Sequence, residues 1–169
     1  MSQKVIFKSI KAALTEIKQI KTVGMWNNDF AKEGEGDSFK YPASFIELKP
    51  EKFRDFSSTG IQDYDLVVTI HLGFEHYKTE PELIYDVKQE IHKKLQHIRL
   101  VDGSDELEYP ISKFTRVDER QNFDHDNLMD IEIDYLVKVR DASGDKRKLV
   151  DVSNHDLTIT PTIVEEIEE

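Results

Sequence analysis

The stretch that decides the fold is residues 65–98, which reads DLVVTIHLGFEHYKTEPELIYDVKQEIHKKLQHI. From Leu66 to Phe74 apolar residues occupy every second position, which is the pattern of a β-strand with one buried face. After Pro81 the apolar residues recur in steps of three and four, as along the buried side of an amphipathic helix. We therefore predict a strand over residues 65–74 and a helix over residues 82–98, with a buried side formed by Ile84, Val87, Ile91, Leu95 and Ile98.

The composition is that of one domain with extensions. The chain has 169 residues, which is enough for a single hydrophobic core but short for two. Its formal net charge is -11, which argues against a protein whose main task is to neutralise nucleic-acid phosphates. Because the chain has no cysteine, disulfides, a thiol nucleophile and thiolate metal ligands are excluded.

Neither secretion nor membrane insertion is expected. The residues after Met1 pass directly into a charged amphipathic pattern, whereas a signal peptide carries an uninterrupted apolar segment. No apolar run reaches the roughly twenty residues that a membrane helix needs. We expect a soluble protein without a membrane partner.

Before residue 65 the pattern predicts one helix and two strands. Apolar positions from Ile6 to Ile20 share one side of a first helix. A strand should follow over residues 23–26, and a short strand over residues 43–48. The strand over residues 43–48 carries apolar side chains on both sides, which implies burial or an interface.

Two connections separate these elements. Residues 27–40 show no periodicity and are expected to form a mobile, exposed loop. Residues 49–63 contain proline, serine and glycine and are expected to form a second connection. Its Phe53 and Phe56 form either a local lid on the core or an exposed contact for a partner.

After the second helix, the sequence predicts two more strands and a tail. Residues 111–117 form the first strand, and residues 128–140 carry the cleanest alternation of apolar and charged positions in the chain. Residues 141–148 form a polar linker, and residues 149–163 contain β-forming residues with no helix to pack against. This tail is either an arm that adds to a neighbouring subunit or a loosely packed terminus.

These elements together predict an α+β fold. The order helix, three strands, helix, two strands gives a mostly antiparallel sheet of about four to five strands with two helices packed on one face. We expect a single domain over residues 1–140, followed by a linker and an extended C-terminal arm over residues 141–169.

No recognised catalytic motif is present in the sequence. The chain lacks a phosphate-binding glycine loop, a nucleophile elbow and a kinase signature. His92 and His97 are five positions apart, whereas a helical zinc site places its histidines four apart. His125 stands between two aspartates in a polar turn, where such residues are common. We expect no cofactor and no metal.

One row of carboxylates lies along a predicted strand. Asp130, Glu132 and Asp134 share one side of it, and such a row has some likeness to the site of a metal-dependent hydrolase. The exposed side of an antiparallel strand often carries such charges, so we expect a solvated face or ion pairs to a neighbouring subunit. The residues expected at an interface are Phe53, Phe56, Asp130, Glu132, Asp134, Leu157, Ile159 and Ile163.

The layout resembles that of one known family. The segment YPASFI at residues 41–46 follows a polar loop, and the alternating strand over residues 66–74 leads to the helix over residues 82–98 and a terminal hairpin. In order and length these elements are similar to phage tail terminator proteins, also called tail completion or minor tail proteins. The similarity extends over residues 2–140. The family has no invariant catalytic motif, so it supplies no functional residues by position.

The resemblance implies a structural virion protein and not an enzyme. Such a subunit forms a ring, expected to be a hexamer, on the end of the tail tube, where it stops polymerisation and joins the tail to the head connector. The implied partners are copies of itself, the tail tube protein and the connector proteins, while DNA passes through without specific binding because like charges repel. The implied location is the tail or neck of the virion, after assembly in the host cytoplasm. The long tail after residue 140 departs from compact members, so another neck or tail-associated adaptor is an alternative.

Overall fold

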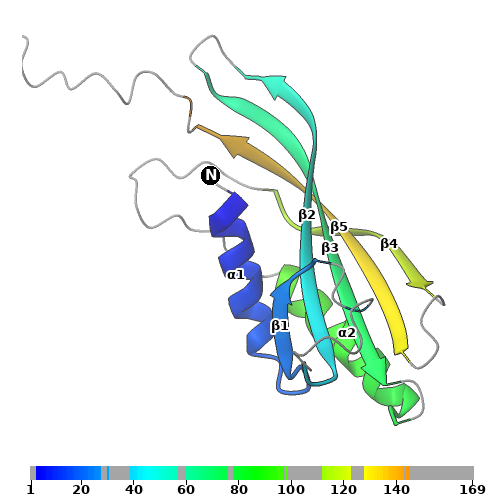
Figure 1. Ribbon diagram of the computed structural model, residues 1–169. Helices are drawn as coiled ribbons and strands as arrows, with labels where there is room; N and C mark the ends of the chain where they lie inside the picture. Colours follow the sequence, from blue (N-terminus) through cyan, green and yellow to red (C-terminus); the bar gives the residue numbers. More distant parts are fainter. Residues whose placement is uncertain are drawn as a thin grey trace, which may run out of the picture.

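Two helices and five strands make up the part of the chain that the computed structural model describes, which is residues 3–27, 30, 39–56, 60–75, 78–96, 98, 112–122, 128–142 and 144 (Figure 1). They follow the predicted order: α1 (Gln3–Thr15), β1 (Thr22–Met25), β2 (Ala43–Asp55), β3 (Gln62–Glu75), α2 (Pro81–Gln96), β4 (Thr115–Asn122) and β5 (Leu128–Asp141). The predicted α+β class is confirmed. The predicted C-terminal arm lies outside the described residues.

The strands form one mixed sheet in the order β1-β2-β3-β5-β4. β1 runs parallel to β2, and every other neighbouring pair is antiparallel. β3 pairs with β5 along its whole length, from Gln62 opposite Asp141 to Glu75 opposite Leu128. Its other edge pairs with β2. The alternating stretch of the sequence is therefore the central strand of the sheet.

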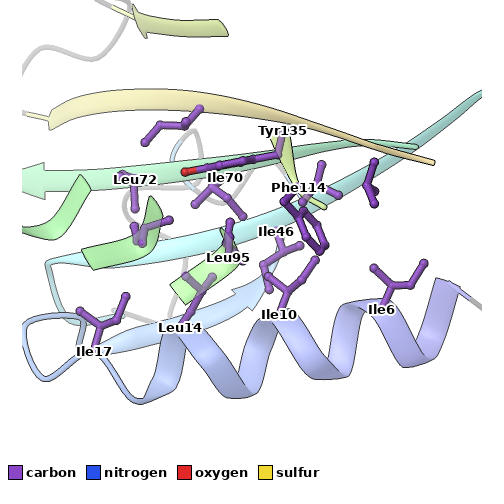
Figure 2. Packing of buried hydrophobic residues seen from close by; sticks show 14 of the residues in the cluster. Ile6, Ile10, Leu14, Ile17, Ile46, Ile70, Leu72, Leu95, Phe114 and Tyr135 are labelled. Carbon is purple, nitrogen blue, oxygen red and sulfur yellow. The ribbon is translucent and has the colours of Figure 1, made fainter. Parts of the chain in front are cut away.

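Both helices pack against the same face of this sheet. The register places apolar residues of β3 and β5 side by side on that face, for example Ile70 opposite Ile133. Figure 2 shows side chains of α1 directed toward the sheet, with Leu95 of α2 in the same layer. The fully buried helix residues are Ile6, Ile10, Leu14, Val87, Ile91 and Leu95. Burying one such side chain contributes about 1.5–3 kcal/mol, so this layer is the main source of stability.

The first helix is shorter than its apolar stripe. α1 ends at Thr15, whereas the sequence predicted a helical side that continues to Ile20. Ile17 and Ile20 are nevertheless buried. After the helix the chain forms a turn in which the amide of Ile17 donates to the carbonyl of Leu14 and the amide of Ile20 donates to that of Ile17. One apolar stripe is thus divided between a helix and a turn that cover the same core.

The second strand is much longer than predicted. A strand over residues 43–48 and a connection over residues 49–63 were expected, but β2 continues to Asp55 and β3 begins at Gln62. Pro50 does not end β2, because β1 pairs only with the segment that ends at Ile46. Beyond that point β2 is an edge strand, which tolerates a residue without an N–H group. The predicted connection over residues 49–63 is therefore wrong, because most of these residues belong to β2 or to the start of β3.

The fourth strand begins later than predicted. Residues 111–117 were expected to form a strand, but β4 is Thr115–Asn122. Its sequence TRVDERQN has no apolar alternation, and its pairing with β5 at the edge of the sheet decides its bounds. The register shifts between Arg116 and Asp118, and the intervening Val117 is exposed. Phe114, just before the strand, is buried in the main core.

The assignment of faces on α2 predicts the effects of two substitutions. Leu95→Ala should lower the free energy of unfolding by about 2–5 kcal/mol, because it leaves a cavity beneath a fully buried position. Lys93→Ala should change it by less than about 0.5 kcal/mol, since Lys93 makes an exposed ion pair with Glu90. Urea unfolding of both variants measures the two effects. Equal losses would contradict the assignment of faces.

Candidate functional site

The sheet face opposite the helices is partly buried, which the sequence did not predict. Thr69, His71 and Gly73 of β3 alternate with the core residues and point to this opposite face, yet they are buried. The prediction of one buried face is therefore wrong at this end of β3. Two groups of side chains cover it, an aromatic cluster and a polar cluster.

The aromatic cluster consists of Phe30, Ala43, Phe45 and Leu128, with Trp26, Phe39 and Tyr41 packed against them. Phe30 belongs to the segment that was expected to be an exposed loop, but only 2% of it is accessible to solvent, so that prediction is wrong at this residue. Its ring packs over Gly73, where an added Cβ would lie 2.6 Å from the ring. A glycine is therefore required on β3 beneath Phe30.

His71 is the centre of the polar cluster, which we define as Glu47, Thr69, His71, Arg120, Asp130, Glu132 and Asp134. Its imidazole ring stacks on the indole of Trp26, with centroids 3.8 Å apart and planes inclined by 7°. On one side, Nε2 lies 3.1 Å from Oε2 of Glu47. On the other side, Nδ1 faces Oε1 of Glu132 at 3.8 Å, which is too long for a hydrogen bond. The ring is thus fixed by stacking and by one carboxylate.

Arg120 of β4 holds two carboxylates of β5. Its Nη2 lies 2.5 Å from Oε2 of Glu132, and its Nη1 donates to Oδ2 of Asp134 at 2.6 Å. The other oxygen of Asp134 accepts a hydrogen bond of 2.6 Å from Oγ1 of Thr69. Both oxygens of Asp134 are therefore engaged within the chain.

These contacts change the pKa values of the groups that form them. Burial raises the pKa of Asp134, but the hydrogen bonds from Thr69 and Arg120 outweigh it and hold that pKa below its usual range. Burial also acts on Glu47, and the hydrogen bonds from Lys49 and His71 lower the pKa of Glu47 overall. The hydrogen bond to Asp134 raises the pKa of Arg120. The carboxylates Glu47 and Asp134 therefore stay charged in the folded protein at neutral pH.

The predicted row of carboxylates is divided by these contacts. Asp130 is 1% exposed, and the side chains of Glu132 and Asp134 are 18% and 13% exposed, so the expectation of a solvated face is wrong. The sequence placed the three residues on one side of the strand, which the register confirms. The structure, however, brings Asp130 and Glu132 together with His71, while Asp134 pairs with Arg120 and Thr69.

The role of His71 was missed by sequence reasoning. One ligand atom each from His71, Asp130 and Glu132 lies within 4.8 Å of the others. The register explains this, since His71 stands opposite Glu132 and Gly73 stands opposite Asp130. The available signal was a histidine on the predicted polar side of one strand and acidic residues on the polar side of another, but their proximity requires the strand order. Of the histidines considered from the sequence, His92 is described and does not belong to this group, whereas His97 and His125 lie outside the described residues.

A second candidate region is the tip of the β2–β3 hairpin, which we define as residues 51–56 and 60–63. Phe53 and Phe56 are 56% and 55% exposed, so they do not form a lid on the core. The ring of Phe53 contacts that of Tyr64, and the guanidinium of Arg140 lies 3.6 Å from the ring centre of Phe56. Arg140 also holds Asp63 through two hydrogen bonds of 2.7 and 2.8 Å. Of the two alternatives drawn from the sequence, these exposures favour an exposed contact for a partner.

The hairpin tip also requires glycine at one position. Gly60 has a φ of 92°, and an added Cβ would collide with the carbonyl oxygen of Gly144. Gly144 therefore lies directly against Gly60 at the hairpin tip. A shallow pocket in this region is lined by Lys52, Arg54, Asp55, Phe56, Asp63, Tyr64, Asp65, Ser112, Lys138, Val139 and Arg140.

Comparison of the sequence with models of known protein families gives no match, and comparison with curated proteins gives none either. In the described residues, neither helix is long and apolar enough to cross a membrane. The interface residues predicted at Leu157, Ile159 and Ile163 lie outside the described residues. The resemblance in layout remains a prediction about family and function.

The hydrogen bonds of the partly buried Asp134 predict a pH-dependent effect. Asp134→Asn should lower the free energy of unfolding by about 1–3 kcal/mol at pH 7, because charge-assisted hydrogen bonds are weakened. Since the folded-state pKa of Asp134 is lowered, its stabilisation is present above about pH 4 and is lost as the pH falls through the folded-state value. Denaturant unfolding of the wild type and the variant at pH 7 and pH 3 measures this difference.

Asp86→Asn on the exposed side of α2 is the control and should change stability by less than about 0.5 kcal/mol. A difference between the wild type and Asp134→Asn that stays the same at both pH values would contradict the assigned role of this carboxylate.

Proposed function

We propose that this chain is a structural subunit of a phage tail, of the terminator or tail completion type. In this proposal the subunit forms a hexameric ring on the end of the tail tube, stops its polymerisation and joins the tail to the head connector. Its partners are copies of itself, the tail tube protein and the connector proteins, in the tail or neck of the virion after assembly in the host cytoplasm. Its role is assembly and not catalysis.

The observation that carries this proposal is the hairpin tip. Figure 1 shows the ends of β2 and β3 extending beyond the layer formed by α1 and α2. The side chains from Glu51 to Phe56 are all exposed, and they include two large aromatic rings that a monomer would leave in water. Exposed aromatic residues on a projecting, hydrogen-bonded strand pair are typical of a contact surface between subunits.

The edge of the sheet offers a second surface for assembly. β4 is the last strand in the sheet order, so its outer edge pairs with no strand among the described elements. Its side chains from Thr115 to Gln121 are exposed. Such an edge can accept a strand from a neighbouring chain, although the charges on β4 restrict which strand can pair. The predicted arm over residues 149–163 has the β-forming composition that such pairing requires.

The charge of the chain is compatible with a ring through which DNA passes. A net charge of -11 repels phosphate, so DNA would meet little adhesion to the subunits. Specific DNA binding is not part of the proposal. An adaptor that binds a single partner as a monomer is the alternative, and it predicts the same fold without a ring.

The mass of the purified protein in solution tests this proposal directly. Multi-angle light scattering should give a multiple of the chain mass, and negative-stain imaging should show rings of uniform size. A species that stays monomeric at all concentrations, alone and in the presence of tail tubes, would contradict a ring and favour the adaptor.

Substitution at the hairpin tip should weaken assembly. In the variant Phe53→Ser/Phe56→Ser, the protein concentration needed for half assembly should rise at least tenfold, because central aromatic contacts each contribute about 2 kcal/mol or more to binding. Light scattering across a concentration series measures this. Tyr85→Ser, which changes an equally exposed ring on α2, is the control and should assemble as the wild type does. Equal assembly of all three proteins would exclude the hairpin tip as an interface.

Removal of the predicted arm tests the second surface. A chain truncated after Lys148 lacks Leu157, Ile159 and Ile163 and should form fewer or smaller oligomers, because the strand that pairs with a neighbour is lost. Light scattering measures particle mass, and thermal unfolding checks that the domain itself is unchanged. Unchanged ring assembly would rule out an inter-subunit role for the arm.

A further inference from the structure

We propose that His71, Asp130 and Glu132 form a binding site for one divalent transition-metal ion, with zinc as the ion that the donors fit. The site lies on the sheet face opposite the helices, away from the hairpin tip. It is independent of ring formation, and its role is to tie β3 to β5.

The geometry of the donors is the first support. One ligand atom from each of the three residues lies within 4.8 Å of the other two, and Nδ1 of His71 is 3.8 Å from Oε1 of Glu132. In a tetrahedral site with zinc–ligand distances of about 2.0–2.2 Å, two donor atoms lie about 3.3–3.6 Å apart. Small rotations of side chains are therefore enough to close the three donors on an ion.

The state of His71 is the second and independent support. The residue is 3% exposed, and its Nδ1 has no hydrogen-bond partner in the described part of the chain. Leaving a buried polar atom unsatisfied costs about 1–3 kcal/mol. The Nε2 atom faces the carboxylate of Glu47, which favours the tautomer with its proton on Nε2 and a lone pair on Nδ1. That lone pair is directed toward the carboxylate of Glu132.

The surrounding residues resemble the outer shell of a metal site. A histidine that binds a metal usually donates its other N–H to a carboxylate, which here is Glu47. Arg120 takes Oε2 of Glu132 and leaves Oε1 on the side of His71. The stacked indole of Trp26 fixes the plane of the imidazole. The donors are therefore held in place before an ion binds.

The charge of the polar cluster also favours a cation. The three carboxylates of Glu47, Glu132 and Asp134 are met by only two cationic side chains, those of Lys49 and Arg120. Negative charge therefore exceeds positive charge among these described residues, which a bound divalent ion would correct. One nitrogen and two oxygen donors suit zinc, whereas magnesium prefers oxygen donors alone.

Titration of the full chain with zinc tests the site. After treatment with a chelator, isothermal calorimetry with zinc chloride should give one ion per chain, and the melting temperature should rise with zinc concentration. Magnesium chloride should neither bind at this site nor compete. The absence of zinc binding would overturn the proposal.

Matched variants separate this site from adventitious binding by other histidines. Asp130→Asn and Glu132→Gln should each weaken zinc binding at least tenfold, and Glu47→Gln should weaken it about 10–100-fold through the orientation of His71. Asp86→Asn is the control, since Asp86 is exposed on α2 and takes no part in the polar cluster. Equal binding by all four variants and the wild type would show adventitious binding and overturn the proposal.

Nuclear magnetic resonance of the wild-type imidazole nitrogens keeps the test decisive if a variant fails to fold. Addition of zinc should shift the Nδ1 signal of His71 strongly, while its Nε2 remains protonated. Zinc that shifts only the signals of other histidines would overturn the assignment to His71.

Discussion

The pairing of β3 with β5 is the constraint on which the rest of the structure depends. Because side chains alternate along a strand, a shift of β5 by one residue against β3 would turn Glu132 toward the helices and Ile133 toward the polar cluster, while His71 and Ile70 kept their faces. The observed register sets Ile70 opposite Ile133 and His71 opposite Glu132. The helices cover only an apolar face, so burial of the core selects this register. The geometry of the polar face is a consequence of the same choice.

The hydrogen bonds of the polar face fix the arrangement of its side chains but add little to the net free energy of unfolding. Taking charged groups out of water costs several kcal/mol per ion, and good pairing returns about that amount. Thr69, Asp134 and Arg120 satisfy one another, and Arg120 also orients Glu132. Such a network tolerates few alternative arrangements, so it positions β4 against β5. The net stability of the fold comes mainly from the apolar layer beneath the helices.

The two candidate regions lie in different parts of the same strands. The hairpin tip carries exposed aromatic rings at the far ends of β2 and β3, whereas the polar cluster is buried where the aromatic cluster covers the sheet. An exposed apolar surface suits contact with another protein, and a buried group of a histidine and two carboxylates suits an ion. The proposed assembly and the proposed metal site can therefore be tested separately.

The sequence by itself determined the order of the elements, the class of the fold and which residues of α2, β3 and β5 face the main core. These follow from the periodicity of apolar residues, which is a local property of the chain. Tertiary structure decided the length of β2, because Pro50 is tolerated only where β2 becomes an edge. It also decided that Asp130 is buried and that His71 meets Glu132, since both depend on which strands are neighbours and on Phe30 and Trp26 packing over the second face. Contacts between residues distant in the chain have no periodic signal, so only the folded sheet brings these groups together.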